Sequence, residues 1–209
     1  MKLVLIGGGE HARVVLDAAR AAGVAIAGCV DVKLTQAMSA LDVLWLGDDD
    51  AALRSAEVNT WHFIAAVGSS AAAGAREQLA LRYAAHGVSW ATVVHPRAIV
   101  SAAAVLEGGV VVLAGAIVNS GACVRAHAIV NSGAIIEHDV DVGEFAHVAP
   151  GVTIGGGSSI GRNAHIGLGA TIRDHVRIGD GAVVGMGAVV IASVAAGAIV
   201  AGVPARPLR

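Results

Sequence analysis

Aliphatic residues in the second half of the chain recur with a period of six. From Ala98 to Ser193, the third residue of every successive hexad is Val, Leu or Ile, without exception over sixteen hexads. The first residue of each hexad is Ala, Val or Ser. A period of six fits neither an α-helix nor an alternating strand, and it is typical of a solenoid of hexapeptide repeats. The pattern therefore predicts a parallel β-helix whose interior is filled by the large aliphatic side chains.

Small residues and glycines fit the corners of such a coil. A small side chain two places before the aliphatic one lets the chain turn without a clash, and Gly155-Gly156-Gly157 or Gly179-Asp180-Gly181 suit tight turns. Strands stacked about 4.8 Å apart would pair their backbones from coil to coil. The spacing resembles that of the left-handed form, in which three hexads close one triangular coil. Sixteen hexads then give a little over five coils.

The first 94 residues alternate between short apolar runs and helical patterns. Strands are expected over 2–6, 24–30, 43–46 and 63–67, and helices over 10–22, 48–54 and 69–86, while residues 88–94 lead into the solenoid. The first helix is expected to turn Val14, Val15 and Ala18 inward and to end at Gly23. This alternation predicts a small, Rossmann-like α/β domain with a parallel sheet at residues 1–94, followed by a left-handed parallel β-helix at residues 95–209.

Composition narrows the classes of function. The formal net charge of −2 on 209 residues gives no basic surface for nucleic acid. No apolar run approaches the roughly 20 residues of a membrane span, and Met1 leads into a strand rather than a signal peptide. Cys29 and Cys123 have neither metal-site nor disulfide spacing, so a reduced, cytoplasmic setting is expected. Because 56% of the residues are hydrophobic, we expect some apolar surface to be buried between subunits.

A glycine-rich loop, Gly7-Gly8-Gly9-Glu10-His11-Ala12, joins the first strand to the first helix. Such a loop lets a phosphate approach backbone N–H groups at the positive end of the helix. Its letters satisfy the dinucleotide fingerprint, with Asp31 about twenty residues on, although a turn needed only for packing would look the same. Only one half of a dinucleotide fold fits before the solenoid. We therefore expect a nucleotide carried by the substrate, with Asp31 accepting from a ribose or base donor, rather than a redox cofactor.

Outward-facing histidines are the second candidate for chemistry. His138 occupies the fifth position of its hexad and is followed by Asp139, and an imidazole beside a carboxylate can act as a general base. A surface histidine without a function would occupy the same position. His147 also points outward and lies one coil, 18 residues, before His165. These two rings are expected to stack, either within a site or as a surface ladder.

A metal site is the weaker alternative for these histidines. The outward set is His127, His138, His147, His165 and His175. Left-handed β-helix carbonic anhydrases use two histidines five places apart plus a remote one. The spacings here are 11, 9, 18 and 10, so that close pair is absent and no metal is expected.

The chain resembles the NeuD/PglD family of sugar acyltransferases over essentially its whole length. The segments that carry the resemblance are KLVLIGGGEHARVV at 2–15, IAAVG at 64–68, VHP at 94–96, IVNSGAIIEHDVDVGEFAHVAP at 129–150 and GVPAR at 202–206. The resemblance implies a homotrimer that uses acetyl-coenzyme A (acetyl-CoA) to acetylate the amino group of a UDP- or GDP-linked 4-amino-4,6-dideoxy sugar. It implies a nucleotide-sugar-binding first domain and a second domain that binds acetyl-CoA and catalyses direct transfer.

Individual roles follow from the same resemblance. His138 matches the general base, Asp139 the acid beside it, and His147 a second active-site histidine. The residues expected to bind substrate are Gly8, Gly9, His11, Arg13, Asp31, Asn131 and His147. Those expected to line the acetyl-CoA cleft are His147, Gly156, Gly167, Leu168, Gly185 and Gly187. The backbone N–H of Gly156 is the natural donor to the oxyanion of the reaction. Glu10 departs from the glycine of many relatives, and its carboxylate could repel a diphosphate or point outward.

Three alternatives to an amino-sugar acetyltransferase remain open. One is an O-acetyltransferase for sialic acid or a related sugar, which would not need a nucleotide pocket near His11. Another is a non-catalytic solenoid that binds a nucleotide sugar, against which the Glu137-His138-Asp139 cluster argues. The third is a metal-dependent hydratase. The sequence identifies neither the sugar nor the base of its nucleotide.

Overall fold

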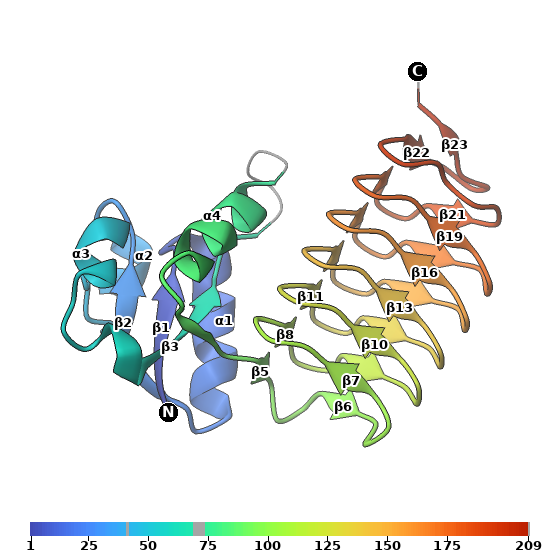
Figure 1. Ribbon diagram of the computed structural model, residues 1–209. Helices are drawn as coiled ribbons and strands as arrows, with labels where there is room; N and C mark the ends of the chain where they lie inside the picture. The colour runs from blue at the N-terminus through green and yellow to red at the C-terminus, as the bar shows by residue number, and fades with distance from the viewer. Residues whose placement is uncertain (41, 69–73, 209) are drawn as a thin grey trace. The chain divides into compact units, whose positions relative to one another are not determined.

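Two compact units make up the chain, Met1–His95 and Pro96–Arg209 (Figure 1). They are seen in a computed structural model that describes residues 1–40, 42–68 and 74–208. The first unit is an α/β fold around a small parallel sheet, and the second is a left-handed parallel β-helix. The fold class predicted from the alternating elements and from the six-residue period is therefore confirmed.

The sheet of the first unit has four parallel strands in the order β2-β1-β3-β4. Their bounds are Lys2–Ile6 for β1, Ala25–Val30 for β2, Trp61–Ala65 for β3 and Ser89–Trp90 for β4. β1 pairs with both β2 and β3, so Ile6 lies between Val30 and Ala65. Because parallel strands end at one edge of a sheet, the loops after these three strands meet there. β3 begins two residues before its expected start at Phe63.

The strand expected over 43–46 is reduced to a single parallel bridge between Cys29 and Trp45. The N–H of Cys29 donates to the carbonyl oxygen of Leu44 at 2.8 Å. The segment passes so close to β2 that a Cβ added at Gly28 would lie 2.5 Å from that same oxygen. It follows the edge of the sheet too briefly to count as a strand.

Short helices connect the strands of the first unit in the described residues. They are α1 (Glu10–Ala21), α2 (Gln36–Ser39), α3 (Asp49–Leu53), the 3-10 turn η1 (Val58–Thr60) and α4 (Ala75–Ala84). Neither α2 nor η1 was predicted. The expectation for Val14 was wrong: its side chain is 43% exposed, while Val15 and Ala18 face the core. Ser69 and Ser70, expected to open the helix that became α4, lie outside the described residues.

An aromatic cluster fills the core of the first unit. Phe63 and Tyr83 are fully buried with ring centroids 5.2 Å apart, and Trp61 meets Phe63 edge-on at 6.1 Å. The hydroxyl of Tyr83 donates to Asp49 at 2.8 Å, which satisfies the buried phenol. These contacts tie α3 and α4 to β3 and so hold the loops at the carboxyl edge of the sheet.

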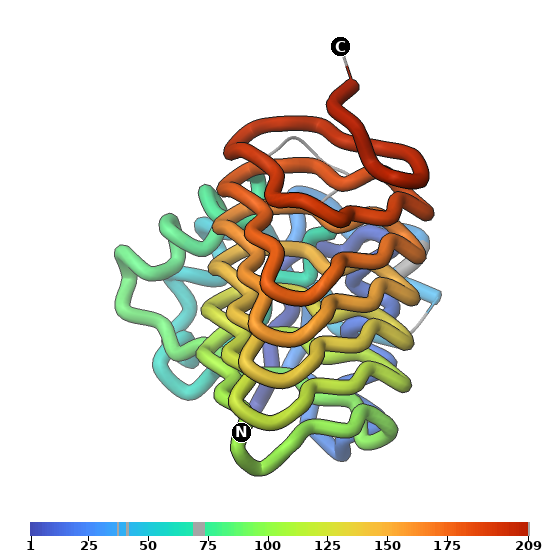
Figure 2. The backbone as a smooth tube through the Cα atoms, turned by 90° about the vertical axis from the view of Figure 1, so that its right-hand side faces the viewer, coloured from blue at the N-terminus to red at the C-terminus, as the bar shows by residue number. Residues whose placement is uncertain are grey.

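Two-residue strands recur every six residues through the second unit, whose backbone winds in stacked coils (Figure 2). After β5 (Val93–Val94) they are β6 (Ile99–Val100), β7 (Val105–Leu106), β8 (Val111–Val112), β9 (Ile117–Val118), β10 (Cys123–Val124), β11 (Ile129–Val130), β12 (Ile135–Ile136), β13 (Asp141–Val142), β14 (His147–Val148), β15 (Thr153–Ile154), β16 (Ser159–Ile160), β17 (His165–Ile166), β18 (Thr171–Ile172), β19 (Arg177–Ile178), β20 (Val183–Val184) and β21 (Val189–Val190). From β5 to β18, each strand pairs in parallel with the strand 18 residues on, as His147 of β14 does with His165 of β17. Three hexads therefore close one coil.

Three sheets form the faces of this prism. The first holds β6, β9, β12, β15, β18 and β21, and the second holds β7, β10, β13, β16 and β19. The third runs through β8, β11, β14, β17 and β20 to β22 (Ile199–Ala201). There the repeat ends, and β23 (Arg206–Pro207) returns antiparallel to β22. The described residues contain no helix that is long and apolar enough to cross a membrane.

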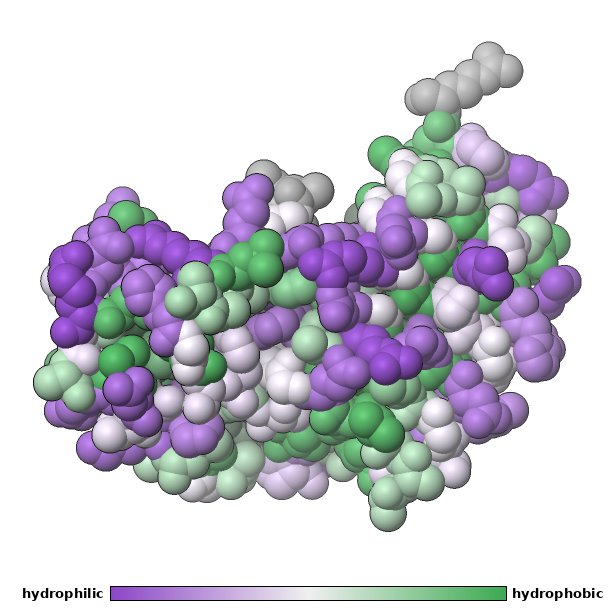
Figure 3. All heavy atoms as spheres, in the orientation of Figure 1, coloured by the Kyte–Doolittle hydropathy of each residue, from purple (hydrophilic) through white to green (hydrophobic). Residues whose placement is uncertain are grey.

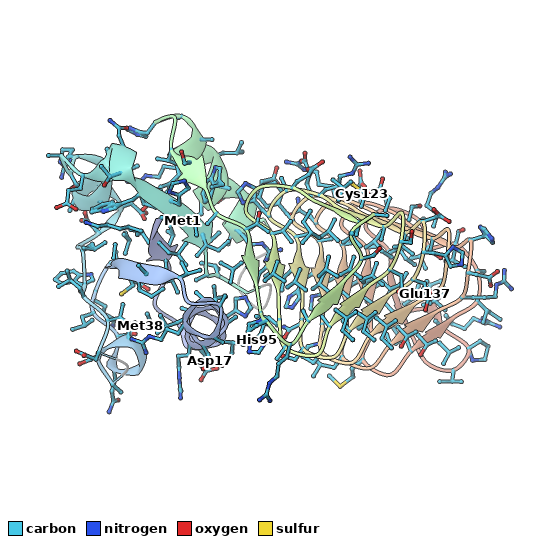
Figure 4. The ribbon with its side chains drawn as sticks, turned by 90° about the horizontal axis from the view of Figure 1, so that it is seen from below. Met1, Asp17, Met38, His95, Cys123 and Glu137 are labelled. Atoms are coloured by element: carbon cyan, nitrogen blue, oxygen red, sulfur yellow. The ribbon has the colours of Figure 1, made fainter. Side chains whose placement is uncertain are left out.

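The third position of the hexad fills the interior as the pattern predicts, and the first position, predicted only to ease the turn, also faces inward (Figure 4). Ile136 and Val148, at the third position, are 0% exposed, and so is Ala146 at the first. A small residue at the first position is therefore required because its side chain also enters the narrow interior. Val100 and Leu106 are only half-buried, since they belong to the first coil.

The sixth position of the hexad turns the corner with a left-handed backbone. Glycine occupies most of these positions, and the other residues with positive φ there are His127, Asp139, Phe145, Asn163 and His175. This conformation costs an L-residue roughly 1–2 kcal/mol, so its side chain must compensate. His127 and Phe145 do so by stacking, with centroids 4.9 Å apart, and the guanidinium of Arg162 lies 5.0 Å from the Phe145 ring.

Candidate active site

His138 and Asp139 form a hydrogen-bonded pair at the corner that follows β12. Nδ1 of the imidazole lies 2.9 Å from Oδ2 of the carboxylate, and both side chains are exposed. Glu137, labelled in Figure 4, precedes them and accepts the backbone N–H of His138 at 3.3 Å. Asp139 holds the left-handed conformation with φ 57°. That backbone directs its carboxylate to the neighbouring ring.

The charge at this corner favours a proton on the imidazole. The hydrogen bond to Asp139 raises the pKa of His138 above its usual value; a small desolvation effect opposes this, and the charges of Asp139 and Glu137 add to the rise. A carboxylate can only accept, so the ring proton lies on Nδ1. When the ring is neutral, Nε2 carries the lone pair that can take a proton from a substrate.

Two glycines, which have no side chains, leave the space that the side chains of His138 and Asp139 occupy. A Cβ added at Gly156, one coil after His138, would lie 2.6 Å from Nε2 of the imidazole. A Cβ at Gly121, one coil before Asp139, would overlap the carboxylate oxygen Oδ1. The φ of Gly156 is not in the left-handed region, so its lack of a side chain is explained by the imidazole rather than by its backbone. The basic nitrogen thus lies against the Gly156 backbone.

In the described residues, the backbone N–H groups at the fifth hexad position take no part in the backbone hydrogen bonds between successive coils. Where a side-chain oxygen is near, it accepts them: Glu107 from Ala126 at 2.8 Å, and Asp180 from Arg162 at 2.9 Å. Gly156 occupies the same hexad position, and its N–H donates to no backbone or side-chain group among the described residues. This N–H can therefore donate to a ligand beside His138.

Asn131 and His147 form a second polar pair. The side-chain oxygen of Asn131 accepts the N–H of Ser132 at 2.8 Å, which fixes the orientation of the amide. Its nitrogen is then the donor to Nε2 of His147 at 3.1 Å. His147 therefore carries its proton on Nδ1, and its Nε2 is already used. His147 is 8% exposed, and its ring contacts that of His165 at 5.2 Å, edge-on rather than stacked as expected.

The two pairs lie on different faces of the prism. His138 and Asp139 follow β12, whereas Asn131 follows β11 and His147 belongs to β14 in another sheet. Within one chain the structure does not bring the expected base and the expected second histidine into one pair. Linear proximity in the motif at 129–150 gave no sign of this separation.

The residues expected at the acetyl-CoA cleft also divide between corners. Gly167 and Leu168 follow β17, and Gly185 and Gly187 follow β20 in the next coil. These four residues therefore lie at the same corner of two successive coils. Gly156 follows β15 in another sheet. A Cβ at Gly167 would lie 2.6 Å from a carbonyl oxygen of the next coil, so coil stacking alone requires that glycine.

Large apolar side chains stand out from the corner that carries Leu168. Leu168 is 53% exposed and Met186, one coil on, is 78% exposed. Hydrophobic residues on the surface of the second unit are visible in Figure 3. Met186 was not predicted as a site residue, although its fifth position in the hexad already placed it outside the prism.

The glycine loop is held by side chains of its own unit. The N–H of Gly8 donates to Oδ2 of Asp31 at 2.7 Å, and the hydroxyl of Thr35 donates to the carbonyl of Gly8 at 2.5 Å. Gly8 is buried, and its N–H is already engaged by the Asp31 carboxylate. Gly9 lies at the exposed start of α1, the positive end of the helix. Glu10 is exposed in that first turn, where its charge suits the helix dipole.

His11 lies on the inner side of this helix start, while Arg13 is exposed. Burial, and then the charge of Arg76, lower the pKa of His11 to about 4, so its ring is neutral at pH 7. A cavity of about 190 Å³ opens at the same edge of the sheet and is lined by Gly7, Asp31, Asp48 and Val67 among others. In open α/β sheets, ligands bind in the crevice at the carboxyl ends of the strands.

In the described part of the chain, no group of three or more His, Cys, Asp or Glu side chains is arranged to hold a metal ion. His175 instead lies against Gly157, where a Cβ would be 2.5 Å from its Nδ1.

Comparisons with known proteins match both units. Residues 2–80 match the family described as the PglD N-terminal domain, and residues 157–192 match the bacterial transferase hexapeptide repeats. A search of curated proteins found no match.

Solved structures match over the whole chain. A perosamine N-acetyltransferase mutant from Caulobacter crescentus, in complex with CoA and GDP-perosamine, is 34% identical with a TM-score of 0.93, covering 100% of this chain and 97% of that one. The acetyltransferase domain of PglB from Neisseria gonorrhoeae is 32% identical with a TM-score of 0.92, covering 99% of each chain. WeeI from Acinetobacter baumannii, at 21% identity and a TM-score of 0.66, covers 100% of both chains and shares the fold.

Proposed function

The chain belongs to the NeuD/PglD-type sugar acetyltransferases, and from this premise we propose that it acetylates the 4-amino group of a nucleotide-linked 4-amino-4,6-dideoxy sugar. Acetyl-CoA is the acetyl donor, as the complex of the PglB domain with acetyl-CoA supports. The observation that carries the proposal is the His138–Asp139 pair, whose Nε2 lies against the backbone of Gly156.

His138 acts as the general base. The sugar ammonium must lose a proton before its nitrogen can attack the thioester carbon, and Nε2 of the neutral imidazole accepts it. Asp139 keeps the Nδ1 proton in place and stabilises the imidazolium that forms, as the acid does in a hydrolase triad. The hydrogen bond of 2.9 Å supports this role.

Acetyl transfer then proceeds without a covalent enzyme intermediate. The amine nitrogen bonds to the carbonyl carbon, and the carbonyl oxygen becomes an oxyanion that the N–H of Gly156 can stabilise. Collapse of this intermediate breaks the C–S bond and releases coenzyme A as a thiolate. The imidazolium of His138 gives its proton to the sulfur, and the second proton that the nitrogen must lose to become an amide leaves to water, so the base is regenerated for the next turnover.

The nucleotide portion of the substrate binds in the first unit. Gly9 and the first-turn N–H groups of α1 face the diphosphate, with His11 and Arg13 beside them. Asp31 acts indirectly, because one of its oxygens already holds Gly8. The cavity at the carboxyl edge of the sheet has room for part of the nucleoside. The GDP-perosamine complex of a relative supports a nucleotide-linked sugar.

The assembly is a homotrimer in the cytoplasm. Asn131 and His147 lie on a different face from His138, so an active site that uses both pairs needs two chains. Leu168 and Met186 then line the arm of acetyl-CoA between neighbours, together with Gly167, Gly185 and Gly187. The free thiols of Cys29 and Cys123 suit a reducing compartment.

An acceptor screen tests this function directly. Release of coenzyme A from acetyl-CoA is measured with GDP- and UDP-linked 4-amino-4,6-dideoxy sugars, with free sialic acid, and with no acceptor. We expect turnover with a nucleotide-linked amino sugar and a loss of about 10²–10⁴-fold in kcat for His138→Ala. Turnover with sialic acid alone would instead make the enzyme an O-acetyltransferase. Bound nucleotide sugar without any turnover would make it a binding protein.

A further inference from the structure

Arg76 is a buried charge that the mechanism above does not use. It lies in the first turn of α4, and its side chain is only 5% exposed. Burial lowers its pKa to about 10, so the guanidinium stays charged at neutral pH. Burying a charge costs free energy unless the surroundings compensate for it. The contacts of this guanidinium show where its charge acts.

The contacts of Arg76 lead to the glycine loop. Its Nη1 donates to the carbonyl oxygen of Val67 at 3.2 Å. The Val67 side chain fills the space beside Gly7, where an added Cβ would lie 2.9 Å from its Cγ2. One residue further, a Cβ at Gly68 would lie 3.5 Å from the Cβ of His11. Arg76 therefore fixes a segment that packs against both ends of the glycine loop.

The charge of Arg76 also acts at the start of α1. After burial, it is the second cause of the low pKa of His11. Glu10 and Arg13 flank His11 on α1 and are exposed, whereas Arg76 approaches it from α4. The positive end of α1, a helix of 12 residues, points to the same place. These two sources of positive potential would together attract an anion.

We propose that Arg76 is a positioning residue for the diphosphate of the nucleotide-linked substrate. It holds the segment at Val67 and Gly68 against the glycine loop, and from inside the unit it supplies positive charge that complements the diphosphate at the start of α1. It acts through these neighbours rather than by touching the substrate. This inference rests on the proposed function, because it concerns the same substrate site.

Steady-state kinetics of Arg76→Gln and Arg76→Lys test the inference. Because the interactions of a charged group are lost, we expect Arg76→Gln to raise KM for the nucleotide sugar about tenfold or more. KM for acetyl-CoA should stay within about twofold, the pattern of lost substrate binding alone. Arg76→Lys keeps the charge and should recover most of the lost affinity. The control is Arg20→Gln, which removes an exposed arginine at the other end of α1.

A second measurement needs no substrate. Titration of His11 by NMR of ¹³C-labelled histidine, assigned with His11→Gln, should give a higher pKa in Arg76→Gln than in the wild type. Arg76→Lys and Arg20→Gln should leave that pKa low. If the wild type accepts no nucleotide sugar, the proposed function fails, yet this titration still decides whether Arg76 controls the charge at the loop.

The inference is overturned if folded Arg76→Gln leaves both KM for the sugar and the His11 titration unchanged. It is also overturned if the Lys and Gln variants raise KM equally, because a purely structural role would not distinguish them. Should the Gln variant fail to fold by circular dichroism, Arg76→Lys decides alone. A sugar KM within about threefold of wild type then supports the inference, and a rise of about tenfold overturns it.

Discussion

Asp139 combines a strained backbone with a hydrogen bond to the residue before it. Its φ of 57° would suit glycine better, and other corners of the same column do use glycine, as at Gly121 and Gly157. Strain of this kind is tolerated where the surrounding structure holds it, and it concentrates at functional sites. Here the left-handed turn points the carboxylate to Nδ1 of His138, which sets both the tautomer and the pKa of the base.

Replacing Asp139 with Asn should move the pH dependence of the reaction. Asp139 raises the pKa of His138, and the base works only when neutral, so wild-type kcat/KM should rise as pH passes through a value above 6.5. Asn accepts the left-handed backbone well but removes the charge, so the rise should shift to lower pH while the plateau falls. The measurement is kcat/KM against pH for both proteins. An unshifted profile would mean that Asp139 does not tune the base.

Replacing Gly156 with Ala should displace the base without disturbing the coil. Ala114 and Ala126 occupy the same hexad position, so the backbone accepts alanine there. The new Cβ would lie 2.6 Å from Nε2 of His138, and the exposed ring must move away. A displacement of about 1 Å can cost 10²-fold, so we expect kcat to fall about 10–100-fold while thermal stability is kept.

A double-mutant cycle isolates the cause of that loss. In the His138→Ala background the ring is gone, so adding Gly156→Ala should cost little more. If the two losses multiply instead, Gly156 acts independently of the imidazole, through its N–H or through the acetyl-CoA cleft.

At the scale of elements, one part of the β1–α1 junction is held by other residues of the protein, and we propose that another part binds the ligand. Gly8 is held by Asp31 and Thr35, and this fixes the path of the loop. We propose that the exposed start of α1, just beyond this loop, binds the substrate. The hexapeptide corners divide their tasks in a similar way: the first and third positions fill the prism, and the fifth and sixth present groups outward.

His11→Ala should weaken the binding of substrate and spare acetyl-CoA. The neutral ring of His11 lies at the start of α1, where we propose that the nucleotide sugar binds in both ground and transition states. We expect KM for the sugar nucleotide to rise and KM for acetyl-CoA to stay within about twofold, with kcat little changed. Initial rates with each substrate varied in turn give both constants. A fall in acetyl-CoA affinity would mean that the two pockets are assigned the wrong way round.

At the scale of the whole molecule, the division of the active-site pairs between faces predicts a shared site. We expect sedimentation at micromolar concentration to give a trimer. We also expect mixed assemblies of His138→Ala and His147→Ala subunits, each weakly active alone, to regain activity, because one interface then receives both intact pairs. A monomer, or mixtures no more active than their parts, would contradict this arrangement. Homogeneous assemblies of each variant are the controls.

The sequence by itself determined the second unit almost completely. A hexad repeat has one register, since shifting it would expose every Val or Ile that now fills the prism, such as Ile136 and Val148. Local chemistry also pointed to His138 and Asp139, because neighbours in a fixed repeat have known directions. In the first unit, the alternation of elements predicted the parallel sheet. The inward face of α1 and the edge segment at 43–46 were less certain, since packing there depends on distant partners.

Only the tertiary structure decided which groups meet across the chain. Asp31 accepts the N–H of Gly8, and His138 fills the space beside Gly156. His138 and His147 lie on different faces of the prism. Each of these relations concerns residues from different coils or strands. Arg76 is the clearest case, because in the sequence it is one arginine in an ordinary amphipathic helix. Its burial beside Val67 depends on how α4 packs against the sheet, and that long-range contact leaves no periodic signal in the sequence.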